Sequence, residues 1–81
     1  MDKIDKALLK LSDKQRHKLM GAFSLVVNGQ LDGLNITKLK GHKDLYRLRI
    51  GNTRLIYRKT DQQQLVVVYV GKRDEQTYRN F

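Results

Sequence analysis

The stretch of sequence that decides the fold alternates between apolar and basic side chains. It reads Leu45-Tyr46-Arg47-Leu48-Arg49-Ile50-Gly51-Asn52-Thr53-Arg54-Leu55-Ile56-Tyr57-Arg58-Lys59. A glycine at the first central position of a two-residue loop is typical of a tight β-hairpin turn, and Gly51-Asn52 stands in that place. The stretch therefore predicts two antiparallel strands in which Ile50 lies opposite Thr53.

Successive residues of a strand point to opposite faces, so this register gives the hairpin two unlike faces. One face carries the predicted pairs Leu48–Leu55 and Tyr46–Tyr57, and the other carries Arg49–Arg54 and Arg47–Ile56. The first face is suited to packing in a hydrophobic core. The second is basic.

A third strand is predicted from Leu65 to Val70, after a turn at Asp61 to Gln64. Pairing across this turn gives Leu55–Val70, Tyr57–Val68, Ile56–Tyr69 and Arg54–Gly71. Arg73, two residues beyond Gly71, points the same way as Gly71. The basic face of the meander then gathers Arg47, Arg49, Arg54 and Arg73 around a glycine.

The first half of the chain has helical periodicity. Apolar residues at i, i+3, i+4 and i+7 predict a first helix, and a second follows at about 13–27 with its own inward residues. These inward residues are Ile4, Ala7, Leu8 and Leu11, then Leu19, Met20, Phe23, Val26 and Val27. Ser12 and Gln15 form a capping-box pattern between the helices, and Asn28-Gly29 is typical of a helix end.

Residues 30–43 have no clear period and are predicted to be a loop, held to the core by Leu34, Ile36 and Leu39. The last segment, Asp74 to Phe81, is expected to be a short helix or a tail. The sequence therefore predicts an α+β fold in which a helical hairpin packs on one face of a small antiparallel meander.

Length and composition limit the possible functions. The chain has 81 residues, enough for one domain at 1–81. It has no cysteine and only two histidines, His17 and His42, so we expect no thiolate nucleophile, serine-type triad, metal site or cofactor. No apolar run approaches the roughly 20 residues of a membrane span, and no signal segment opens the chain. We expect a soluble protein of the cytoplasm.

Charge points to a polyanionic partner. The net charge is +9, and the basic excess lies mostly in residues 38–81. Such an excess on a small fold favours nucleic acid, with an anionic membrane or an acidic protein as alternatives. Arginines directly opposite each other destabilise a sheet, but guanidinium groups bind phosphate oxygens at two points, so the cluster is typical of a phosphate site. The alternative is a solvated basic face that discourages aggregation of sheet edges.

Four short stretches and one tyrosine, in order along the chain, resemble the RelE/ParE superfamily of bacterial toxins. They are Lys38-Leu39-Lys40-Gly41, Tyr46-Arg47-Leu48-Arg49, Arg54-Leu55-Ile56-Tyr57, Val70-Gly71-Lys72-Arg73 and Tyr78. The resemblance covers about residues 4–81 and is closer to the RelE branch, whose members cut mRNA in the ribosomal A site. Family chains usually open with a β-strand, whereas here the helical pattern begins at Ile4, so we expect that strand to be absent or truncated.

The resemblance also implies roles for single residues. The implied catalytic residues are Arg54, Arg73 and Tyr78, and the implied RNA-binding or phosphate-binding residues are Lys38, Lys40, Arg47, Arg49 and Lys72. Well-known ribosome-dependent members have lysines where this chain has Arg47 and Arg49. We expect a metal-independent endoribonuclease in which the RNA 2′-hydroxyl attacks the adjacent phosphorus. Tyr78 would be the base, Arg73 would stabilise the phosphorane and Arg54 would hold the scissile phosphate.

Two other functions remain open at this point. One is a ParE-like inhibitor of DNA gyrase without nuclease chemistry, and the other is an inactive basic RNA-binding module. The partners implied by the resemblance are an acidic cognate antitoxin, the ribosome and mRNA. DNA is expected only indirectly, through the antitoxin, and no membrane contact is expected.

Overall fold

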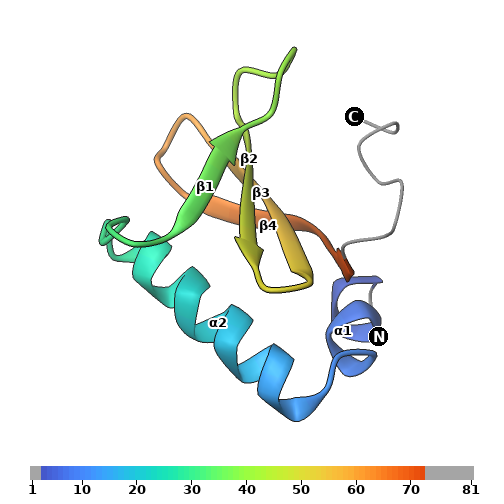
Figure 1. The fold of residues 1–81 in the computed structure, drawn as a ribbon. Helices are drawn as coiled ribbons and strands as arrows, with labels where there is room; N and C mark the ends of the chain where they lie inside the picture. Colours follow the sequence, from blue (N-terminus) through green and yellow to red (C-terminus); the bar gives the residue numbers. More distant parts are fainter. Residues whose placement is uncertain (1–2, 73–81) are drawn as a thin grey trace.

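The structure is a computed structural model, and it describes residues 3–72 of the chain. The elements in chain order are α1 (Lys3–Leu9), α2 (Asp13–Val27), β1 (Asn35–Lys38), β2 (Leu45–Ile50), β3 (Thr53–Lys59) and β4 (Leu65–Lys72). The four strands form one antiparallel sheet in the order β1-β2-β3-β4 (Figure 1). Within residues 3–72 the first element is a helix, and no strand precedes it.

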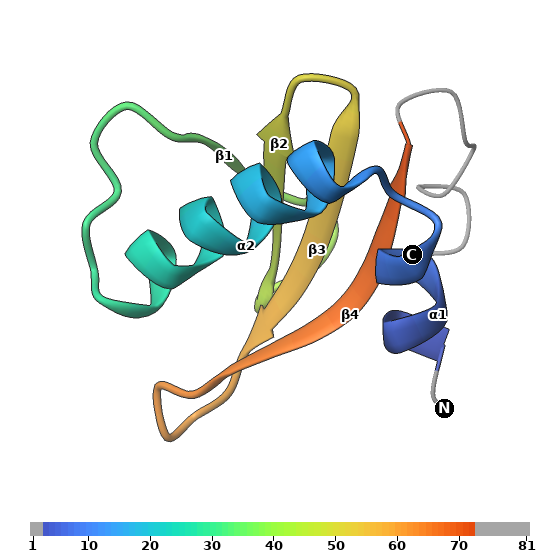
Figure 2. The same cartoon turned by 90° about the horizontal axis from the view of Figure 1, so that it is seen from below.

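Both helices cover the same face of the sheet, which confirms the predicted α+β architecture. α2 crosses β2 and β3, and α1 packs beside β4 (Figure 2). The opposite face of the sheet carries no helix in the described residues. In that part of the chain no helix is long and apolar enough to cross a membrane.

The two ends of α2 are formed as the sequence predicts. The backbone N–H of Gln15 donates to the Ser12 hydroxyl at 3.1 Å, and the backbone N–H of Ser12 donates to the Gln15 side-chain oxygen at 3.0 Å. At the other end Asn28 is the C-cap and Gly29 has a φ of +78°, a conformation that glycine adopts without strain. The residues at its two ends therefore account for where this helix begins and ends.

The core lies between α2 and the helix-side face of the sheet. Its buried residues are Leu11, Leu19, Ala22, Val26, Leu48, Leu55, Tyr57 and Val70. The prediction that Met20 and Val27 point inward is wrong, because they are 43% and 59% exposed. The buried residues of α2 follow the i, i+3, i+7 spacing from Leu19, and each of the two exposed residues lies one position further round the helix.

The prediction that residues 30–43 form only a loop is wrong in part. Residues 35–38 make β1, an edge strand in which Ile36 lies opposite Leu48 of β2. Leu34 and Ile36 pack against the core, as predicted. The strand has only four residues and one apolar side chain turned to the core, so it shows too little alternation to be recognised in the sequence.

Strand register decides which side chains share a face. All the predicted pairs between β2 and β3 are confirmed, and so are Arg54–Gly71, Leu55–Val70 and Ile56–Tyr69 between β3 and β4. The predicted Tyr57–Val68 pair is wrong, since Tyr57 lies opposite Val67. The loop after β3 begins at Thr60, one residue earlier than expected, and an irregularity beside Ile56 absorbs Val68 as an extra residue.

Candidate nucleic-acid interface

The candidate site lies on the face of the sheet that the helices leave open. Two rows of paired residues cross this face: Asn35–Arg49–Arg54–Gly71, and Thr37–Arg47–Ile56–Tyr69. We call the group Arg47, Arg49 and Arg54 the arginine face. None of the eight residues in the two rows carries a carboxylate.

The arginine side chains are partly immobilised in the free protein. All three are half-buried, and the Nε atoms of Arg47 and Arg54 are buried. A terminal nitrogen of Arg47 donates to the hydroxyl of Thr37 on β1 at 3.3 Å. Guanidinium groups held in this way lose less conformational entropy when they bind phosphate than freely rotating side chains do.

Buried apolar residues lie beside the arginines on the same face of the sheet. The sequence analysis did not predict their burial. Ile56 is 0% exposed and Leu45 is 2% exposed, although their register turns them away from the helices. The sequence does indicate this burial, because apolar residues stand at these outward-facing strand positions. These apolar side chains give the aliphatic parts of neighbouring arginines a surface on which to pack.

Gly71 ends the first row beside Arg54 and is buried. Glycine has no side chain, so neighbouring groups can approach the backbone of β4 closely at this position. The sequence analysis predicted this pairing, and the structure confirms it.

Arg58 lies on the same face and forms an ion pair. Its Nε lies 3.3 Å from a carboxylate oxygen of Asp44, and both side chains are about half exposed. The ion pair stands at the far end of the sheet from Gly71, opposite Leu45. Arg58 is therefore the natural reference for the three arginines of the arginine face.

Three of the eight predicted site residues come together, namely Arg47, Arg49 and Arg54. Lys38 pairs with Tyr46, so it lies on the helix-side face, and Lys40 is exposed in the loop after β1. Lys72 is the last residue of β4. Arg73, Tyr78 and the predicted segment 74–81 lie outside the described residues. Within residues 3–72 no three His, Asp or Glu side chains are placed to hold a metal ion.

The chain is a small basic α+β protein in which two helices cover one face of a four-stranded antiparallel sheet. A family model described as "ParE toxin of type II toxin-antitoxin system, parDE" matches residues 1–77. The chain belongs to this family. No curated protein matches the chain.

Solved structures show the same fold. A chain of the RelB-RelE antitoxin-toxin complex from Methanococcus jannaschii superposes with a TM-score of 0.79 at 22% identity, over 100% of this chain and 95% of that one. A chain of the archaeal RelE-RelB complex from Pyrococcus horikoshii OT3 gives 0.71 at 22% identity, over 93% and 91%. At this identity the likeness concerns the fold alone.

Proposed function

We propose that this toxin cleaves mRNA in the ribosomal A site, without a metal ion, and so inhibits translation. The observation that carries the proposal is the arginine face. Three half-buried arginines stand in two adjacent rows of the sheet face that carries no helix in residues 3–72, with no carboxylate among the eight residues of those rows. An immobilised positive surface of this kind is suited to a backbone of closely spaced phosphates.

Each arginine has a place in the proposed reaction. Arg47 and Arg49 hold backbone phosphates, and Arg54, which lies opposite Gly71, holds the scissile phosphate. The RNA 2′-hydroxyl attacks the adjacent phosphorus and the 5′-oxygen leaves. Arginine stabilises the added charge but is a poor base, because its pKa lies above about 12. We therefore assign the base to Tyr78 and the stabilisation of the phosphorane to Arg73.

A second candidate is an inhibitor of DNA gyrase that binds without cleaving nucleic acid. The match to a ParE family model favours it. The arginine face, taken alone, also supports binding without chemistry, since none of its three residues is a base at neutral pH. Both candidates are toxins, and they differ in target and in the presence of a nuclease step.

We also propose an acidic antitoxin as the partner that holds the toxin inactive. The two solved neighbours are complexes that contain RelB, and this chain carries a net charge of +9. A partner of opposite charge associates faster and screens the repulsion within the toxin.

Primer extension on a translated message after induction of the toxin tests the choice between the candidates. Discrete cuts that appear only on translated RNA support the nuclease. Inhibited DNA supercoiling with intact messages supports the gyrase inhibitor. If neither effect appears, the chain is an inactive basic module and both proposals are wrong.

Single-turnover cleavage on programmed ribosomes then separates binding from chemistry. Tyr78→Phe and Arg73→Ala should bind nearly as well as the parent and cleave on the order of 100-fold more slowly, because they remove groups that act in the transition state. Arg47→Ala should mainly weaken binding. Cleavage by Tyr78→Phe at the parental rate would show that Tyr78 is not the base.

A further inference from the structure

The side of the sheet that carries the arginine face changes its chemistry from β2 towards β4. All three residues of the arginine face stand on β2 and β3. The β4 residues paired on that side are Val66, Tyr69 and Gly71, and none of these three is charged. Val66 is 47% exposed and Tyr69 is half-buried. A basic strip on β2 and β3 therefore lies beside an uncharged strip on β4 that contains an aromatic ring.

Tyr69 stands beside the arginine to which we assign the scissile phosphate. Arg54 lies directly opposite Gly71, and Tyr69 is two residues before Gly71 on the same side of β4. Tyr69 is thus the diagonal neighbour of Arg54. The Cα atoms of such neighbours lie roughly 7–8 Å apart, within reach of long and aromatic side chains. Because glycine brings no side chain, Tyr69 is the first β4 side chain beside Arg54 in the direction of Ile56.

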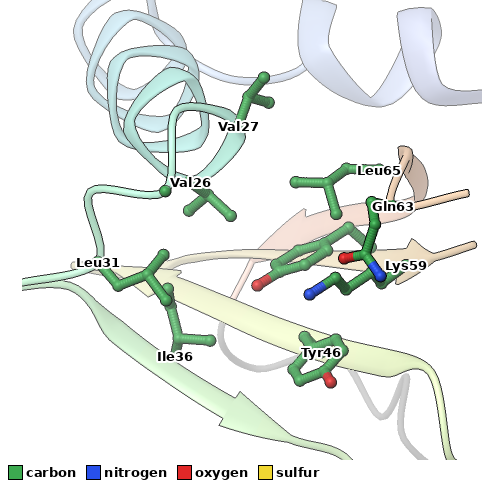
Figure 3. Close-up of a pocket in the computed structure, with 10 residues that line it drawn as sticks. Val26, Val27, Leu31, Ile36, Tyr46, Lys59, Gln63 and Leu65 are labelled. Atoms are coloured by element: carbon green, nitrogen blue, oxygen red, sulfur yellow. The ribbon is translucent and has the colours of Figure 1, made fainter.

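The other tyrosines of the described strands lie on the helix-side face. Tyr46 and Tyr57 line a pocket of about 390 Å³ between α2 and the strands. Figure 3 shows this pocket with apolar side chains from α2 and β4, among them Val26 and Leu65. The rings of Tyr46 and Tyr57 stack on each other at 5.4 Å and 16°. Within residues 3–72, Tyr69 is therefore the one aromatic residue on the side of the arginine face.

A single RNA strand carries the same two chemistries side by side. Its backbone has a negative charge at each phosphate, and its unpaired bases present flat surfaces that stack on aromatic side chains. Protein sites for single strands combine a basic groove with such rings. At the opposite edge of this side of the sheet, β1 presents Asn35 and Thr37, which have no aromatic surface. A strand whose backbone lies over the arginines therefore finds a stacking partner for its bases on β4.

We propose that the ring of Tyr69 stacks on a base of the RNA strand, next to the phosphate that Arg54 holds. The inference rests on the proposed RNA substrate and adds the orientation of the strand, with its backbone over β2 and β3 and its bases towards β4. Every base has a face that can stack, so Tyr69 contributes affinity and position but little sequence preference. Tyr69 is a binding residue, since it touches a base and takes no part in proton transfer.

The fluorescence of a short oligoribonucleotide that contains 2-aminopurine tests the proposal, because the emission of this base falls when it stacks. The full chain should quench the emission when it binds. Tyr69→Leu keeps an apolar side chain without a ring, so it should quench far less and bind on the order of tenfold more weakly. Tyr69→Phe and Tyr69→Trp keep a ring and should quench like the parent. Thermal unfolding verifies that each variant is folded.

The dependence of RNA affinity on salt separates stacking from charge. Tyr69→Leu removes no phosphate contact, so the logarithmic slope of affinity against salt should stay as in the parent. Arg54→Ala should reduce that slope by about 0.7. Val66→Ala is the matched control on the same side of β4. It removes exposed apolar surface but no ring, so it should leave both the quenching and the slope unchanged.

The outcomes separate this proposal from the proposed function. If the parent does not bind the oligoribonucleotide, or if folded Tyr69→Leu binds and quenches equally well, the stacking proposal is wrong, and primer extension still decides the nuclease. If translated messages stay intact while the parent quenches through its ring, the nuclease fails and the stacking site stands. Unchanged RNA binding by Tyr69→Leu, with weakened binding of the protein encoded beside the toxin, would assign this side of β4 to a protein partner instead.

Discussion

The arrangement of Arg49 directly opposite Arg54 is unfavourable for the isolated sheet. Like charges at paired positions destabilise a sheet, and here both side chains are half-buried, so water screens them incompletely. A sequence under selection for stability alone would place a neutral β-branched residue at one of these positions. The pair is one reason for the proposal that this face binds a ligand.

Replacing Arg49 by threonine should stabilise the free protein and weaken its binding to RNA. We expect Arg49→Thr to raise the free energy of unfolding by about 0.2–1 kcal/mol, since it removes the repulsion with Arg54 and adds a residue that favours strands. Urea denaturation and RNA binding measure the two effects. Arg58→Thr is the control: it loses the ion pair with Asp44, so it should not stabilise. A destabilised Arg49→Thr would contradict the argument.

Tyr57 should make the protein sensitive to high pH. Burial, together with the nearby Tyr46, raises the pKa of Tyr57 above its ordinary value of 10.0. Folding therefore favours the neutral phenol, and this contribution is fully present below about pH 10 and is lost as the pH rises through the folded-state pKa. Denaturation of Tyr57→Phe and the parent should show a shallower alkaline decline for the variant. Parallel curves above pH 10 would show that Tyr57 does not contribute.

Faces could be predicted for most residues of the three-stranded meander but not for the strand before it. Arg47, Arg49 and Arg54 were placed correctly because Gly51-Asn52 fixes the register locally. Lys38 could not be placed, since its face depends on pairing with β2, which the sequence does not reveal. Ile56 is fully buried on the arginine side of the sheet, and no local sequence pattern predicts the extent of this burial.

At the scale of elements, a few residues determine where α2 begins and ends. The capping box joins Ser12 and Gln15 by two hydrogen bonds. Ser12→Ala should lower the free energy of unfolding by about 1 kcal/mol, because it leaves a backbone N–H at the helix start without its acceptor. Chemical denaturation measures the loss. Ser24→Ala, at an exposed position inside the same helix, should have little effect or stabilise slightly. Equal losses at both positions would contradict the role of the cap.

The strands differ in how much of them the sequence predicts. β2 and β3 were predicted because their alternation is long and their turn is short. The register of β4 was only partly predicted, because it depends on a loop whose length differs by one residue from the expected one. A shift of one residue in the pairing register moves every side chain of a strand to the opposite face. The irregularity at Val68 restores the predicted pairing between β3 and β4 from Ile56 towards Thr53.

At the scale of the whole molecule, the sheet separates two surfaces of different chemistry. The arginine face is basic, and the helix-side face holds the core, the pocket between α2 and the strands, and the exposed apolar side chains of Met20 and Val27. The sheet therefore separates the proposed RNA site from the pocket on the helix-side face.

The net charge of +9 should give salt opposite effects on stability and on RNA binding. Raising ionic strength from about 0.01 M to about 0.1 M shortens the screening length from about 30 Å to about 10 Å. Screening weakens repulsion within the free protein, so the midpoint of thermal unfolding should rise. RNA affinity should fall over the same range, with a logarithmic slope of about −2 if the arginine face contacts three phosphates of a single strand.

Lysines on the exposed side of α2 supply the control for this last prediction. Lys14→Gln with Lys18→Gln should flatten the dependence of stability on salt while leaving the RNA slope unchanged, because these positions are exposed and lie on the helix, away from the arginine face. Arg47→Ala should reduce the RNA slope by about 0.7. If salt lowers the unfolding midpoint instead, ion pairs such as Asp13–Arg16 and Asp44–Arg58 outweigh the repulsion, and the basic surface is not a cost to folding.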